Sequence, residues 1–160
     1  MLSIKFIFVG KMREKHYISA FEEYRKRLGA YCTLETEEIP ECRLSEKPTE
    51  KEIELALSRE GREILRRVPE NAALIALCVE GGEVSSEAFA RKLSDYAVHG
   101  RSRLCFVVGG SFGLDGAVKS RADWRLSLSK MTFPHHLARV MLSEQLYRAF
   151  TINQGGKYHK

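Results

Sequence analysis

The stretch Leu-Cys-Phe-Val-Val-Gly-Gly-Ser-Phe-Gly, residues 104–113, decides the fold class of this chain. Its first half, Leu104–Val108, is a continuous apolar run, which is typical of a strand that is buried on both faces. Its second half is a glycine-rich segment, Gly109-Gly110-x-x-Gly113, at which the strand ends. Strands of this kind belong to parallel sheets covered by helices, so the stretch predicts an α/β protein.

Strand and helix patterns alternate along the rest of the chain. The expected strands are apolar or alternating runs at 2–9, 32–39, 72–79, 104–108 and 124–128. Four longer helices are expected from apolar side chains at helical spacing, over about 17–28, 49–67, 85–97 and 134–151. A short fifth helix is expected to end near residue 121. We therefore expect one α/β domain over residues 1–160, a mostly parallel sheet with helices on both faces.

Local signals set the ends of several elements. Thr49-x-x-Glu52 is a capping box that opens a helix. Gly81-Gly82 is expected to turn the chain after the third strand. Pro134 is expected in the first turn of the last helix, where a missing N–H costs nothing. That helix has an unusually wide apolar surface, which suggests packing on two sides.

Composition limits the class of protein. The chain has 160 residues, of which 44% are hydrophobic and 29% charged, as in ordinary globular proteins. It has no apolar run near the roughly 20 residues that span a bilayer, and its start lacks the features of a signal peptide. We expect a cytoplasmic protein with no membrane partner. The four cysteines form no C-x-x-C pair, and no ligand spacing is complete, so we expect no metal.

Ligands of parallel sheets bind beyond the carboxyl ends of the strands, here after Leu77, Val108 and Leu128. The glycine-rich segment 109–113 would let backbone approach a nucleotide-like cofactor, although a plain tight turn fits its spacing about equally well. Segment 129–133 mixes apolar side chains with hydroxyl groups. It looks like a pocket wall for an adenine ring, and a simple strand-to-helix connection fits nearly as well.

Other polar residues point to a polyanionic partner. The net charge is +5, which suits nucleic acid but is also common elsewhere. Arg139, near the start of the last helix, is a candidate contact for an RNA phosphate. The adjacent His135 and His136 are interpreted as hydrogen-bonded surface residues. The tail Tyr158-His159-Lys160 provides an aromatic ring, an imidazole and a cation that could act in a site if the tail packs against the protein, although most termini are frayed.

Several motifs together resemble one family. They are Gly-Gly-Ser-Phe-Gly-Leu at 109–114, Leu-Ser-Leu-Ser-Lys-Met-Thr-Phe-Pro-His at 126–135, Glu-Gln-Leu-Tyr-Arg-Ala-Phe at 144–150 and the terminal Tyr-His-Lys. Phe-Ile-Phe-Val-Gly-Lys at 6–11, Tyr-x-Lys-Arg-Leu at 24–28 and Glu-Gly-x-x-Ile-Leu at 60–65 follow the same order. The chain is similar to bacterial large-subunit rRNA pseudouridine N3-methyltransferases of the SPOUT superfamily. Only the loop from about 41 to 47 carries no matching pattern.

The resemblance implies a trefoil knot in the C-terminal part and S-adenosylmethionine as cofactor. It places the cofactor site at Leu77, Gly109, Leu128, Ser129, Lys130, Met131, Thr132 and Phe133. It also implies a homodimer in which the knotted regions pack together and one subunit's tail lies near the other's cofactor. The implied substrate is a pseudouridine in a stem-loop of 23S rRNA, recognised in the assembled ribosome.

We hypothesise a mechanism in which the protein mainly aligns the methyl donor with N3 of the base. Tyr158 would position the base, His159 would accept the N3 proton, and Lys160 or Arg139 would steady the developing anion or a phosphate. Two other functions remain open. One is a non-enzymatic ribosome-binding module with the same fold, and the other is a related SPOUT methyltransferase that acts on tRNA.

Overall fold

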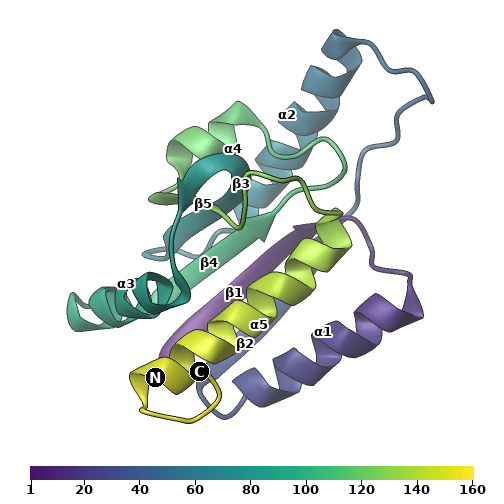
Figure 1. The fold of residues 1–160 in the computed structure, drawn as a ribbon. Helices are drawn as coiled ribbons and strands as arrows, with labels where there is room; N and C mark the ends of the chain where they lie inside the picture. Colours follow the sequence, from purple (N-terminus) through teal and green to yellow (C-terminus); the bar gives the residue numbers. More distant parts are fainter.

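Strands and helices alternate from one end of the chain to the other, as the sequence predicts. The computed structural model describes residues 1–160 and is shown in Figure 1. Its strands are β1 (Leu2–Val9), β2 (Cys32–Ile39), β3 (Ala73–Glu83), β4 (Arg103–Val108) and β5 (Trp124–Ser127). Its helices are α1 (Lys15–Leu28), α2 (Glu50–Arg67), α3 (Ser86–Val98), α4 (Gly116–Arg121) and α5 (His135–Asn153).

The five strands form one parallel sheet. Their order is β2-β1-β4-β3-β5, and every neighbouring pair is parallel. The predicted parallel sheet is therefore confirmed. Because all strands run the same way, their carboxyl ends lie along one edge, which is where parallel sheets bind ligands.

Helices cover both faces of the sheet, because the central strands carry apolar side chains on both faces. In β1, Ile4, Phe6 and Phe8 join a core with α1, α3 and α5, whereas Ile7 and Val9 join a second core with α2 and α4. All residues of β4 after Arg103 are buried. The continuous apolar run at 104–108 is thus explained by burial on both faces.

Strand β3 is longer than the sequence predicts. Its partner residue in β5, Leu126, pairs first with Leu77 and then with Gly82, so the residues between them bulge out of the ladder. A Cβ atom at Gly81 would lie 2.8 Å from the carbonyl carbon of Arg125. The expectation that Gly81-Gly82 turns the chain is wrong: these glycines lie within β3 and let a bulge pass close to β5.

The helix ends agree with the sequence more closely. The Thr49 hydroxyl accepts a hydrogen bond from the Glu52 amide at 3.1 Å, as the capping box predicts. Pro134 precedes α5 as its N-cap, one position before the predicted first turn. Helix α5 packs against both α1 and α3, which confirms the interpretation of its wide apolar surface. The trefoil knot stays a prediction. No helix is both long and apolar enough to cross a membrane.

Gly81→Ala should lower the free energy of unfolding by about 1–3 kcal/mol, because the added methyl group must push β5 away from β3. Gly82→Ala is the matched control, since the nearest atom to a Cβ there is 4.0 Å away. Urea denaturation of the two variants measures the difference. Equal midpoints for both variants would contradict this account of the bulge.

Candidate functional site

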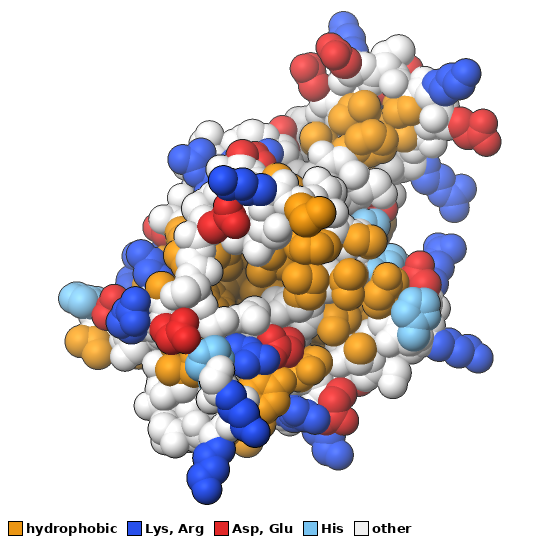
Figure 2. All heavy atoms as spheres, viewed as in Figure 1, with side chains coloured by type: hydrophobic (Ala, Val, Ile, Leu, Met, Phe, Trp, Pro, Cys, Tyr) orange, Lys and Arg blue, Asp and Glu red, His pale blue; other side chains and the backbone are white.

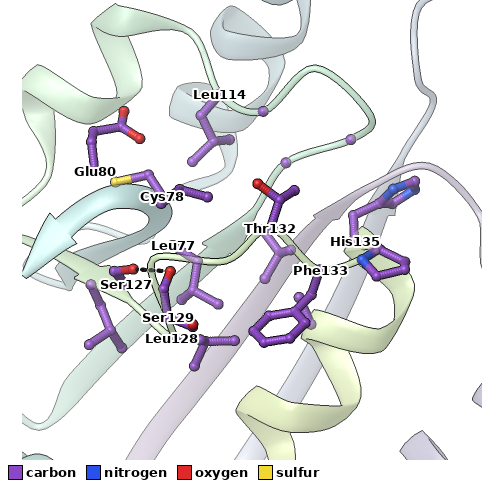
Figure 3. A pocket seen from close by; sticks show the side chains of 18 of the residues that line it. Leu77, Cys78, Glu80, Leu114, Ser127, Leu128, Ser129, Thr132, Phe133 and His135 are labelled. Atoms are coloured by element: carbon purple, nitrogen blue, oxygen red, sulfur yellow. Dashed lines mark hydrogen bonds between the residues drawn. The ribbon is translucent and has the colours of Figure 1, made fainter. Parts of the chain in front are cut away.

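A cavity of about 620 Å³ lies at the carboxyl edge of the sheet (Figure 3). Three segments enclose it: the bulge of β3, the glycine loop (defined here as residues 109–113), and the segment 126–135 that leads into α5. Half of its 22 lining residues are hydrophobic. Its volume and its mixture of apolar walls with a few polar groups are those of a small-molecule site.

The glycine loop folds back on itself. The Gly113 amide donates to the Gly110 carbonyl at 3.1 Å, and Gly113 has a φ of +84°. A Cβ atom at Gly109 would lie 2.4 Å from the Gly113 carbonyl oxygen, so a side chain there would force the loop open. Glycine is therefore required at Gly109 for the loop to close against the cavity.

Glu41 holds the glycine loop from outside the cavity. Its Oε1 accepts a hydrogen bond from the Ser111 amide at 2.8 Å and would lie 2.5 Å from a Cβ atom at Gly110. Its Oε2 would lie 3.2 Å from a Cβ atom at Gly10, whose φ is +90°. The carboxylate thus sits between two glycines. It belongs to the one loop that carried no pattern, and no local signal predicts a contact with a residue 70 positions away.

Two serine hydroxyls shape the segment after β5. Ser127 donates through its Oγ to the Ser129 carbonyl at 2.8 Å, and the Met131 amide donates to the Ser129 Oγ at 3.1 Å. The predicted cofactor residues that line the cavity are Leu77, Gly109, Leu128, Ser129, Met131, Thr132 and Phe133. Lys130 is exposed and is not among the lining residues.

The cavity also contains polar residues that the sequence analysis did not assign to it. Glu80, from the bulge of β3, forms an ion pair with Lys119 of α4, and the hydrogen bond from Lys119 lowers the pKa of Glu80. Burial lowers the pKa of His135, and the neighbouring His136 adds to this effect. The two charged lining residues therefore compensate each other, and the imidazole of His135, on the opposite side of the cavity, favours its neutral form.

Arg139 lies in the interior, so its predicted role as an RNA contact is wrong. Its side chain is fully buried. Its Nη2 donates to the carbonyls of Val9 at 2.6 Å and Gly10 at 2.7 Å, and its Nη1 donates to Glu38 at 3.0 Å. A guanidinium without accessible surface cannot reach a phosphate. Arg139 instead ties the start of α5 to the end of β1.

The C-terminal tail is docked on α5 and α3. The Tyr158 hydroxyl donates to Glu144 at 3.0 Å, and burial raises the pKa of this phenol. The Nδ1 of His159 accepts from Arg148 at 3.1 Å, while its Nε2 lies 2.7 Å from Glu87. Three polar partners, Glu144, Arg148 and Glu87, thus hold a terminus that would ordinarily fray.

The tail and the cavity lie at opposite ends of α5 (Figure 1). This helix begins at His135, which lines the cavity, and ends at Asn153. Its 19 residues span about 28 Å at the usual helical rise. The structure therefore does not bring Tyr158, His159 and Lys160 to the cavity of the same chain.

Comparison with known proteins places the chain in a family. A family model described as a predicted SPOUT methyltransferase matches residues 2–159. The chain belongs to this family.

Individual SPOUT relatives match over their full length. The chain is 45% identical to the ribosomal RNA large subunit methyltransferase H of Clostridioides difficile, over 99% of this chain and 100% of that protein. It is 42% identical to the protein of the same name from Levilactobacillus brevis, with the same coverage. A solved structure of a probable methyltransferase from Bordetella pertussis is similar in fold, with a TM-score of 0.58 and 13% identity, over 93% of this chain and 95% of that one.

Glu41→Ala should speed hydrogen exchange at the Ser111 amide about tenfold or more, because a hydrogen bond to a charged carboxylate is worth about 1.5–3 kcal/mol. Glu41→Gln keeps an oxygen acceptor and should retain most of the protection. Exchange followed by NMR measures both. Glu46→Ala is the control, since this exposed carboxylate of the same loop has no partner in the structure. Equal exchange in the Ala and Gln variants would contradict the role of Glu41.

Proposed function

We propose that this SPOUT protein transfers a methyl group from S-adenosylmethionine to N3 of a pseudouridine in a stem-loop of 23S rRNA, in the assembled ribosome. The observation that carries the proposal is the full-length match, at 42–45% identity, to proteins named ribosomal RNA large subunit methyltransferase H. A module that only binds ribosomes has no need of a cavity of small-molecule size, which makes it the weaker alternative.

The cavity suits the proposed cofactor. Leu77, Leu128 and Phe133 offer apolar surface for an adenine ring, as Figure 3 shows. Glu80 supplies carboxylate oxygens for ribose hydroxyl groups. Because Glu80 and Lys119 compensate each other, no unpaired cation in the lining opposes a positively charged sulfonium. The lowered pKa of His135 removes one further source of repulsion.

The chemistry demands alignment rather than activation of the donor. Bound S-adenosylmethionine supplies a methyl group on a positively charged sulfur, which is already a good leaving group. The protein then has to hold the base nitrogen in line, at roughly 3–3.5 Å from the methyl carbon.

The tail residues divide the remaining tasks. The raised pKa of Tyr158 keeps its phenol protonated, so Tyr158 suits positioning of the base rather than removal of a proton. His159 is the proposed acceptor of the N3 proton. Because its Nδ1 accepts from Arg148, it must release Arg148 before it takes up that proton there. Lys160 is exposed and would steady the imide anion.

A homodimer would bring tail and cavity together. Exposed apolar side chains line the cavity in the bulge of β3, the glycine loop and the segment before α5: Val79, Phe112 and Met131. Figure 2 shows hydrophobic side chains gathered around the hollow on this face. A second copy that covers this surface would carry its own tail with it, which supports a composite site.

Methylation assays with radiolabelled S-adenosylmethionine test the proposed function. We expect label in 23S rRNA when the substrate is the assembled ribosome, and none in tRNA. Calorimetry should show cofactor binding to the protein alone. Label in tRNA would favour the tRNA-modifying alternative, and cofactor binding without transfer to any RNA would favour the binding module. Absence of cofactor binding would exclude both enzymes.

A composite site predicts complementation between two inactive chains. Deletion of residues 158–160 should abolish methylation while cofactor affinity stays unchanged. Leu128→Trp should fill the cavity and abolish cofactor binding. A heterodimer of the two chains has one intact site of two, so it should regain about half of the wild-type activity. Failure of the mixture, with heterodimers shown by mass spectrometry, would contradict a site shared between chains.

A further inference from the structure

A basic segment lies next to the cavity at the carboxyl end of β1. It comprises residues 11–16, of sequence Lys-Met-Arg-Glu-Lys-His, and is called the basic segment below. Lys11, Arg13 and Lys15 are exposed, and none of them forms an ion pair with a carboxylate. The single acidic residue of the segment, Glu14, lies 3.0 Å from Nδ1 of His136. Three cations against one carboxylate leave the segment with a net positive charge.

Cations further along α1, the helix that begins within the basic segment at Lys15, form ion pairs. Arg25 and Arg27, further along α1, pair with Glu22 and Glu23, both at 2.9 Å. Positive charge on that part of the helix is thus largely compensated. Figure 2 shows Lys, Arg and His side chains together at the edge of the molecule where α1 and α5 begin.

A row of rings connects the basic segment with the cavity. The ring centroids of His16 and Tyr17 are 4.3 Å apart, and those of Tyr17 and His136 are 6.4 Å apart. His136 in turn lies 4.2 Å from His135, which lines the cavity. Flat side chains between exposed cations are the combination that single-stranded nucleic acid binds, by base stacking and phosphate contacts.

The basic segment is fixed to the body of the protein at three points. Arg139 holds the Gly10 carbonyl just before it, at 2.7 Å. Met12 is buried, and its amide donates to Glu38 at 3.1 Å. Glu14 contacts His136 on α5. A segment held in this way presents its cations in a defined geometry. Binding therefore costs little free energy for ordering the backbone of the segment.

We propose that the basic segment, with Tyr17 and His136, is a docking track for the RNA strand that flanks the target nucleotide. Lys11, Arg13 and Lys15 contact backbone phosphates, and the rings of His16 and Tyr17 stack on a base or ribose beside the cavity. The inference rests on the proposed function, because it takes RNA as the substrate.

The test removes the charge without touching the cavity. In the triple variant Lys11→Gln/Arg13→Gln/Lys15→Gln, binding to 70S ribosomes from a strain without the modification is measured by fluorescence at several salt concentrations. Affinity should fall about tenfold or more near 0.1 M salt, and the slope of log K against log salt should shrink by about 2. The KM for ribosomes should rise while kcat stays within about twofold, since these contacts are equally present in the transition state.

A matched control removes the same charge elsewhere. The variant Lys51→Gln/Arg62→Gln/Arg91→Gln carries its changes on α2 and α3, at exposed residues without ion pairs. It should bind ribosomes nearly as the wild type does. Cofactor affinity, measured by calorimetry, and the thermal midpoint should be unchanged in both variants, which separates lost docking from misfolding.

His16→Ala tests the rings apart from the charges. It should lower kcat/KM several-fold and leave the salt slope unchanged, because stacking releases no counterions. Wild-type affinity and slope in the Lys11/Arg13/Lys15 variant would overturn the inference, as would an equal loss in the control. If the wild-type protein binds cofactor and methylates ribosomes in these cases, only the docking track fails. If it does neither, the proposed function fails with it.

Discussion

The buried guanidinium of Arg139 joins the start of α5, which borders the cavity, to the ends of two strands. It donates to the carbonyls of Val9 and Gly10, at the end of β1, and to Glu38 of β2. Burial lowers the pKa of Arg139 to about 10, so the group is still charged at neutral pH. Its centre also lies 4.7 Å from the ring centroid of Phe8. Removing a partner from such a group leaves an uncompensated buried charge, which costs far more than the pair itself gains.

The position of this contact explains why the site holds its shape. Loops at a sheet edge have few neighbours, and their geometry depends on the contacts that fix their ends. Arg139 fixes the end of the segment after β5, Glu41 fixes the glycine loop, and the bulge at Gly81 fixes the wall from β3. Each of these contacts joins the loop to a residue distant in sequence. The shape of the cavity therefore depends on tertiary contacts, whereas the strands of the sheet follow from local sequence patterns.

This division decides how much the sequence could reveal. The strands can be predicted because burial on both faces requires continuous apolar runs. The N-cap at Thr49 can be predicted because its hydrogen bond spans only three residues. Gly81-Gly82 misleads, since a bulge and a turn need the same permissive backbone. Arg139 misleads for another reason: a single cation on an apolar helix has the same spacing whether it faces solvent or the core. Glu41 offers no signal, because its partner is 70 residues away.

The separation of tail and cavity has a consequence for selectivity. A lone chain has the cofactor cavity at one end of α5 and the proposed proton acceptor, His159, at the other, where Glu87 and Arg148 already occupy its ring nitrogens. On the proposed function, methyl transfer then requires both a second chain and a substrate that draws His159 from these partners. Each requirement lowers the chance of methylating an incidental nucleobase. A net charge of only +5 acts in the same direction, because weak non-specific attraction leaves recognition to contacts that a whole ribosome can satisfy at once.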